Sequence, residues 1–370
     1  MEKEFNVKFY NKSAVFQKNL SDEIPESDIT FTQQINGGQG ELLIDLAIPF
    51  DDIPSYITLF NFVRVYEVDS ENTTGRLIYT GWVSQVVPFV TGGRSGVRVI
   101  CLGLVSLLSL SLYKDGASFD VTQSAVDPKA IVDDIITNFQ GVYPPATGFE
   151  WIGSDAVTGI REGGNVDTVG QVVTFVYEKL SWIKSLVETI ALADPGWYFF
   201  IDAGGDVFFK NKSATPEHTF TIGKDIQSLE IPKSIEEIVN DVTVAYDGGT
   251  QNATDATSIT AHGKREKYID KSSEITVAGT ALQIATKEVE DGKDETIEAR
   301  IVINNQYDIE SIRPGQTCQV RNFLKGSEIF NSNMVIVSTT YRNGVTLEIN
   351  LEAKRDMATE LRKLIDVQTS

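Results

Sequence analysis

The sequence predicts a β-rich α+β fold made of two similar small antiparallel β-barrel domains with an inserted α/β domain. Three patterns predict it. Residues 77–113 read as a long strand, a glycine-rich turn, a second strand and a short apolar helical turn. Residues 345–351 alternate apolar and polar side chains with the two-residue period of a strand. Between these β-rich ends, apolar residues recur at helical spacing, which predicts a mixed region in the middle of the chain.

The first β domain is predicted over residues 1–113, as a barrel or a sandwich. Residues 77–89 are rich in Val, Ile, Tyr, Trp and Phe, which suit a pleated, half-buried surface. Gly92, Gly93 and Gly96 supply the positive-φ positions of a hairpin loop. Asn36-Gly37-Gly38 is a turn signal between two strands. The other strands are expected at residues 5–15, 28–35, 41–49 and 62–68.

The inserted domain is predicted over residues 114–217. Asp127-Pro128 starts a helix, with Asp as the N-cap and Pro at the first helical position. Ser181 caps a second helix, which Asp194-Pro195-Gly196 ends. A strand is expected at 172–179, and a hairpin is expected around the Gly-Gly pair of residues 203–206.

The chain is expected to return to the first barrel over residues 218–236. The second β-barrel domain is predicted over 237–352, followed by a C-terminal amphipathic helix over 353–370. Its apolar face must be buried either on its own domain or on a partner. Within the second domain the expected elements are strands at 241–246, 298–303, 317–322, 334–342 and 345–351 and a helix at 280–289.

The two β domains are predicted to be copies of one fold. A strand at 41–48 precedes Asp52-Ile53, just as a strand at 297–303 precedes Asp308-Ile309. In both regions the next elements follow in the same order, which is a short strand, a loop, a long strand, a turn and a closing strand. The hypothesis requires the two domains to superpose strand for strand.

Composition excludes several classes of function. Hydrophobic residues make up 41% of the chain, which is enough for an ordinary core, and the formal net charge is −20. Such a charge disfavours a sequence-reading nucleic-acid binder, because phosphate binding needs clustered Lys and Arg. The N-terminus has no apolar signal segment, and the longest apolar run is too short to span a bilayer. No stable membrane insertion is therefore expected.

No catalytic, cofactor-binding or metal-binding residue is predicted, so the chain is not expected to be an enzyme. Cys101 and Cys318 lie in apolar strand-like runs and are expected to be buried free thiols. His218 and His262 lack the spacing of metal ligands.

Three further groups have ordinary structural explanations. The glycines of 92–96 lack the following Lys-Ser/Thr of a phosphate loop and indicate a hairpin turn. The acidic run 288–295 lacks the ligand order of a calcium loop and indicates a solvated helix end. The pairs Asp51-Asp52 and Asp133-Asp134 indicate surface charge rather than glycoside chemistry.

Five loose patterns occur in a fixed order, and together they resemble the tail hub, or baseplate hub, proteins of tailed bacteriophages (the tail-associated protein N-terminal hub domain family). The resemblance covers nearly the whole chain. These patterns are Ile78-Tyr79-Thr80-Gly81, residues 99–104, the capped helix followed by residues 196–200, residues 238–244 and residues 312–316.

The resemblance implies a structural virion protein that forms a homotrimeric hub at the tail tip. Such a hub adapts a sixfold tail tube to a threefold distal tip and frames the channel for DNA ejection. The implied partners are the tail tube or distal tail protein, the tape-measure protein and distal tip or receptor-binding proteins, with DNA only in transit. Assembly would take place in the cytoplasm of the host bacterium. No lysozyme or peptidase extension is expected in this sequence.

The alternative is a β-rich surface or carbohydrate-binding module. An exposed aromatic cluster would favour it, and the candidates are Trp82, Trp151, Trp182 and Trp197.

Overall fold

The fold is β-rich with few helices, as the sequence predicts. The structure is a computed structural model that describes residues 4–11, 15–20, 29–68, 75–91, 94–142, 160–162, 164–194, 196–230, 233–234, 236–294, 296–304, 311–322, 334–342 and 346–352. Outside these residues lie Gly92, Gly93, Trp151 and the predicted C-terminal helix over 353–370. Within them, no helix combines the length and the apolar character needed to span a bilayer.

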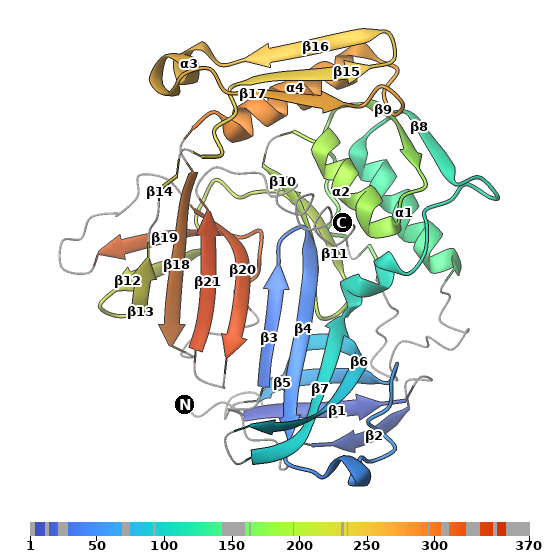
Figure 1. Ribbon diagram of the computed structural model, residues 1–370, viewed down its shortest axis with the longest axis vertical. Helices are drawn as coiled ribbons and strands as arrows, with labels where there is room; N and C mark the ends of the chain where they lie inside the picture. Colours follow the sequence, from blue (N-terminus) through green and yellow to red (C-terminus); the bar gives the residue numbers. More distant parts are fainter. Residues whose placement is uncertain are drawn as a thin grey trace.

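The N-terminal region is a strongly bent antiparallel sheet with the strand order β3-β4-β7-β6-β5-β1-β2 (Figure 1). Its long β6–β7 hairpin contains the two strands predicted within residues 77–113. The expected turn between β3 and β4 lies at Ile35 and Asn36, and Asn36 adopts a φ of 54°. The strands are β1 (Glu4–Tyr10), β2 (Phe16–Asn19), β3 (Ile29–Gln34), β4 (Gly37–Leu46), β5 (Phe62–Val68), β6 (Arg76–Thr91) and β7 (Arg94–Gly103).

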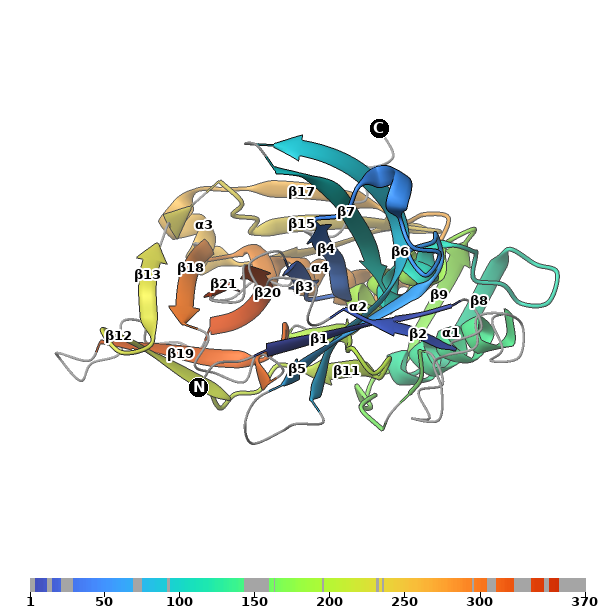
Figure 2. The same ribbon diagram turned by 90° about the horizontal axis from the view of Figure 1, so that it is seen from below.

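The C-terminal strands close into a six-stranded barrel, which Figure 2 shows nearly end-on. Around the barrel the order is β12-β13-β18-β21-β20-β19, and β19 pairs again with β12. A short strand, β14 (Lys233–Ser234), pairs antiparallel with the start of β18. The barrel strands are β12 (His218–Ile222), β13 (Ile226–Glu230), β18 (Thr296–Asn304), β19 (Thr317–Asn322), β20 (Met334–Arg342) and β21 (Thr346–Glu352).

The expectation that residues 218–236 return to the first β domain is wrong for β12, β13 and β14. β12 pairs in parallel with β19, and β13 pairs antiparallel with β18, so this segment completes the C-terminal barrel. The chain bends at residues 223–225, where Gly223 has a φ of 85° and Asp225 accepts a hydrogen bond from the Thr221 amide. This bend lets one segment pair with both open edges of the barrel.

The predicted internal repeat appears in four strands of each β region. The orders β4-β7-β6-β5 and β18-β21-β20-β19 are the same, and every neighbouring pair is antiparallel. The regions differ beyond these strands. The second edge of β3 pairs with β20, so it is not available to close the N-terminal sheet on β1 or β2. A second closed barrel is therefore not observed in the described chain.

The region after β7 contains the predicted α/β elements. Asp127 accepts a hydrogen bond from the Lys129 amide at the start of α1, and Ser181 accepts one from the Lys184 amide at the start of α2. The predicted hairpin is β10–β11, and β10 also pairs in parallel with the start of β4. The elements are η3 (Leu104–Ser109), β8 (Asp120–Val126), α1 (Pro128–Val142), β9 (Val173–Glu178), α2 (Trp182–Leu192), β10 (Trp197–Ile201) and β11 (Val207–Asn211).

Residues 241–292 form a separate layer rather than part of a second barrel. The strand order in its sheet is β16-β15-β17, and α4 packs on the sheet (Figure 1). The prediction of one barrel over 237–352 is therefore wrong for this stretch. The elements are β15 (Asp241–Tyr246), β16 (Gly249–Thr254), α3 (Ala256–His262), β17 (Glu266–Asp270) and α4 (Ala278–Gly292).

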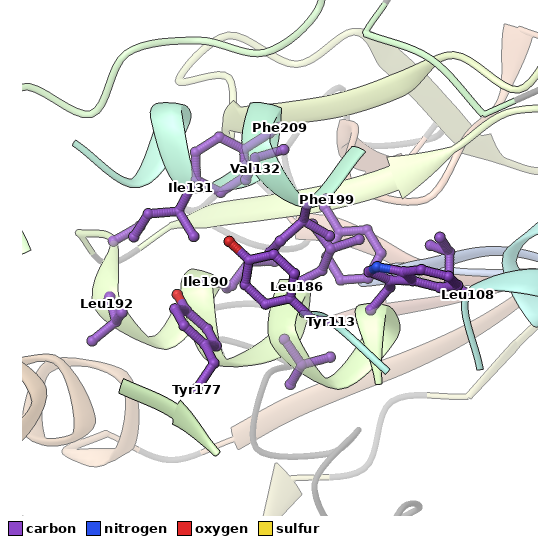
Figure 3. Close-up of a cluster of buried hydrophobic side chains, with 14 of the residues drawn as sticks. Leu108, Tyr113, Ile131, Val132, Tyr177, Leu186, Ile190, Leu192, Phe199 and Phe209 are labelled. Atoms are coloured by element: carbon purple, nitrogen blue, oxygen red, sulfur yellow. The ribbon is translucent and has the colours of Figure 1, made fainter. Parts of the chain in front are cut away.

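Two large hydrophobic cores hold these parts together. One lies between α1, α2 and the β10–β11 hairpin (Figure 3). It continues to α4 and β15. The other joins the N-terminal sheet to the C-terminal barrel, where the rings of Phe31 and Tyr341 stack with centroids 5.3 Å apart. The shared apolar contacts and the β3–β20 pairing make the two β regions one packed unit.

Candidate assembly surface

The outer edge of β6 extends beyond its neighbour. β5 pairs with β6 only as far as Trp82, and the backbone of Val83 is bonded to Phe60 and Asn61. From residue 84 to 91, no strand in the described chain pairs with this edge, while the other edge pairs with β7. Pro88 lies within this stretch, as expected for an edge strand, because Pro cannot donate a backbone hydrogen bond.

An open apolar groove runs beside this edge. It is lined by β6 and by the connection between β4 and β5, including Ile57, Leu59, Val86 and Val87. The exposed fractions are 46% for Leu59, 39% for Val87 and 82% for Val90. We call the groove and the edge of residues 84–90 the β6 edge surface. Unpaired backbone groups beside exposed apolar side chains are a template for pairing with another chain.

An aromatic pair forms one end of this surface. Phe60 and Trp82 stack with ring centroids 5.2 Å apart and planes 6° apart. Phe60 is 45% exposed and has a φ of 67°, a backbone conformation that is uncommon for a bulky residue. The Trp82 indole donates to Ser106 Oγ at 2.9 Å, which orients the ring beneath Phe60. The pair is therefore held in place before any partner binds.

The other two tryptophans that the structure describes do not form the aromatic cluster of a carbohydrate-binding module. Trp182 and Trp197 are buried in the core around α1 and α2. Among the tryptophans that the structure describes, Trp82 alone is partly exposed, and Phe60 covers one face of its ring.

The two cysteines are buried free thiols, as predicted. Burial raises the pKa of the Cys318 thiol to about 12 and raises that of Cys101 further, so neither is a reactive thiolate near neutral pH. The Nε2 atom of His218 lies 3.0 Å from the Gln316 side chain, and His262 ends α3 in a different layer. Within the described residues, no group of acidic, His and Cys side chains could hold a metal ion.

The acidic pairs considered for glycoside chemistry have separate structural surroundings. Asp133 pairs with Lys129 on the surface of α1 at 3.0 Å. Asp134 accepts hydrogen bonds from the Tyr113 hydroxyl and from Gln123. Asp51 and Asp52 are exposed in η2 (Phe50–Asp52). The two pairs belong to different elements and do not share a described cavity.

Two carboxylates of the acidic run near the end of α4 form ion pairs with lysines. Glu288 pairs with Lys267 of β17, and Glu290 pairs with Lys293 at 2.7 Å.

The fold is that of solved tail proteins. A prophage MuSo2 43 kDa tail protein from Shewanella oneidensis matches with a TM-score of 0.63 at 14% identity, over 96% of this chain and 99% of that chain. A tail protein from Neisseria meningitidis MC58 matches with a TM-score of 0.63 at 10% identity, over 97% and 98%. Prophage tail protein gp18 from Listeria monocytogenes EGD-e matches with a TM-score of 0.59 at 10% identity, over 99% and 100%. No family model matches, and no curated protein sequence matches.

Proposed function

We propose that the protein is a structural component of a phage tail, and that it forms a homotrimeric hub at the tail tip. The observation that supports this proposal is the match of the whole fold to three tail proteins, each covered over at least 98% of its length. The proposal assigns the chain a structural role and no catalytic one. Among the described residues both cysteines are buried free thiols, and no group of acidic, His and Cys side chains could hold a metal ion.

The repeated strand order suggests how a threefold hub meets a sixfold tube. The four-strand units β4–β7 and β18–β21 have the same order and directions. Three copies of the chain would present six such units, about 60° apart around the axis. Each unit would face one subunit of the tail tube or distal tail protein, and the tape-measure protein and the ejected DNA would pass through the centre.

The β6 edge surface is the proposed contact between neighbouring copies. It combines an unpaired strand edge with exposed apolar side chains, which a partner chain would cover. A contact between different surfaces of neighbouring copies must close into a ring, or it would produce fibres. Distal tip or receptor-binding proteins would then bind the open end of this ring, and the particle would carry the hub at its tail tip.

Mass measurement tests the proposal directly. Multi-angle light scattering at micromolar concentration, alone and with the tail tube protein of the same phage, should show a closed trimer. A chain that remains a monodisperse monomer under both conditions contradicts the hub proposal.

A further inference from the structure

Two small cavities lie where the β10–β11 hairpin meets the two β regions, and the side chain of Arg313 lines both. The first has a volume of about 130 Å³, and its floor is aromatic, formed by Tyr198, Phe200 and Phe208. The second has a volume of about 190 Å³ and lies toward β3, β4 and β6. Figure 1 shows the hairpin in this central position, between the barrel, the N-terminal sheet and the helices.

Two cations converge on the first cavity. The Arg313 guanidinium carbon lies 4.9 Å from the centroid of the Phe208 ring, and Lys210 Nζ lies 5.7 Å from it. Neither side chain has an ion pair or a side-chain hydrogen bond to any part of the chain that the structure describes. The chain has 52 acidic and 32 basic residues, so carboxylates outnumber the cations with which they could pair. Two unpaired cations at one aromatic ring are therefore a specific feature of this cavity.

The nearest acidic groups are bonded elsewhere. Glu217, at the rim of the first cavity, accepts hydrogen bonds from the Thr317 amide at 3.2 Å and from the Gln316 side chain at 3.4 Å. Asp202, in the second cavity, accepts one from the Asp206 amide at 2.9 Å, and burial raises its pKa. Neither carboxylate neutralises Arg313 within ion-pairing distance.

The loop that carries Arg313 is held rigidly. The Arg313 amide donates to Gln316 Oε1 at 2.6 Å, and the same oxygen lies 3.0 Å from His218 Nε2 of the barrel. Gly315 has a φ of 93°, and a Cβ there would lie 2.1 Å from the Tyr198 ring. The backbone of this loop therefore packs directly on the aromatic floor, which positions the Arg313 backbone beside the cavity before a ligand binds.

We propose that this cavity binds a carboxylate, with Arg313 and Lys210 as the charge partners and the aromatic floor in contact with the apolar body of the ligand. Arg suits a carboxylate because its planar guanidinium can donate two parallel hydrogen bonds. A singly charged group fits better than a phosphate dianion, because Glu217 lies at the rim and would repel the second charge. The site does not depend on the proposed hub function.

The carboxylate has two possible sources, a free small molecule or an acidic side chain of a protein partner. Two probes separate them. Sodium benzoate presents a free carboxylate on an aromatic ring. N-acetyl-Glu-Phe-amide presents only a side-chain carboxylate, and N-acetyl-Gln-Phe-amide is its neutral counterpart. Ligand-detected NMR titration of the full chain should give saturable binding of at least one carboxylate probe, with a dissociation constant of about 1–10 mM. Binding of the Glu peptide identifies the protein source, and binding of benzoate alone identifies the small-molecule source.

Three variants test the assignment. Arg313→Gln should weaken binding about tenfold or more, and Lys210→Gln about threefold or more, because each removes one charge partner. Lys224→Gln is the matched control, because the Lys224 side chain follows the end of β12 and is 70% exposed. This substitution should change the affinity less than about twofold. Circular dichroism and thermal unfolding verify the fold of each variant. If Arg313→Gln does not fold, Lys210→Gln decides the result alone.

With the unmodified chain, two outcomes overturn the proposal. Either neither carboxylate probe shows saturable binding, or the Gln peptide shows saturable binding as tight as that of the Glu peptide. Equal affinities of Lys210→Gln and Lys224→Gln have the same consequence, because the carboxylate would then not recognise this cavity.

Discussion

The buried amide of Asn240 connects three segments at the edge of the β15–β17 layer. Its Nδ2 donates to Ser258 Oγ at 3.1 Å and to the Gly263 carbonyl at 2.9 Å, and its Oδ1 accepts from the Arg265 amide at 2.8 Å. The Asn240 side chain and its bond to Ser258 are buried, where an unpaired polar group costs more than a bond contributes, and the other two bonds are partly buried.

Replacing this amide should destabilise the protein. Asn240→Ala leaves the Arg265 amide and the Gly263 carbonyl unpaired, so we expect a loss of about 2–4 kcal/mol in the free energy of unfolding. Urea unfolding followed by circular dichroism measures it. Asn350→Ala, which removes a single bond to Ser338 on a barrel strand, is the control and should cost about 1 kcal/mol or less. Equal losses in the two variants would contradict the structural role of Asn240.

At the scale of elements, the layer of the β15–β17 sheet and α3 has acidic side chains with lowered pKa values. Hydrogen bonds from Lys264 and from Asn252 lower the pKa of Asp241. Hydrogen bonds from backbone amides and neighbouring side chains similarly lower the pKa values of Asp255 and Asp270. Each of these groups binds a proton less tightly in the folded chain than in the unfolded chain.

This arrangement predicts the direction of the pH dependence of stability. The contribution of Asp241 is fully present above its unfolded pKa of about 3.9 and is lost as the pH falls through its lower folded pKa. We expect Asp241→Asn to be less stable than wild type near pH 6 and the difference to shrink toward pH 3. Urea midpoints measured across this range test it. The exposed Asp120→Asn on β8 is the control, and a constant difference for Asp241→Asn at every pH would refute the prediction.

At the scale of the whole molecule, the β6–β7 hairpin and the β15–β17 layer lie at opposite ends (Figure 1). The β6 edge surface is therefore far from the layer that packs on the α/β region. This separation lets assembly be tested without disturbing the β15–β17 layer.

Charge on the edge should prevent the proposed assembly. Val87→Lys and Val90→Lys add a charge beside unpaired strand groups, which disfavours pairing with another chain. We expect a shift from trimer to monomer in light scattering, with unfolding free energies within about 0.5 kcal/mol of wild type, because both side chains are exposed. Val172→Lys, at a 64% exposed position before β9, should remain trimeric. A trimer that persists in both edge variants would place the contact elsewhere.

The acidic excess leads to a second prediction for the assembly. We expect much of the net charge of −20 to line the axial channel, where it would keep DNA phosphates from adhering during ejection. Cryo-electron microscopy of the trimer provides the surface potential of the bore. A neutral or basic bore would rule out this role for the charge.

Local sequence patterns alone determined where the helices and strands of this protein lie and part of the order of the strands in its sheets. Capping and alternation act over a few positions, so neighbouring residues predict the caps at Asp127 and Ser181 and the two-residue period of β21. The succession of such local patterns along the chain also predicts the repeated order of four strands. Only the tertiary structure decided which edges pair. The 218–230 segment joins β18 and β19, and β20 takes the second edge of β3, because any strand edge can bond to any other and the shared core selects the partner. The sequence did not predict the proposed assembly surface or the Arg313 cavity for the same reason. The exposure of a side chain and the lack of an ion pair depend on residues that are far apart in the chain.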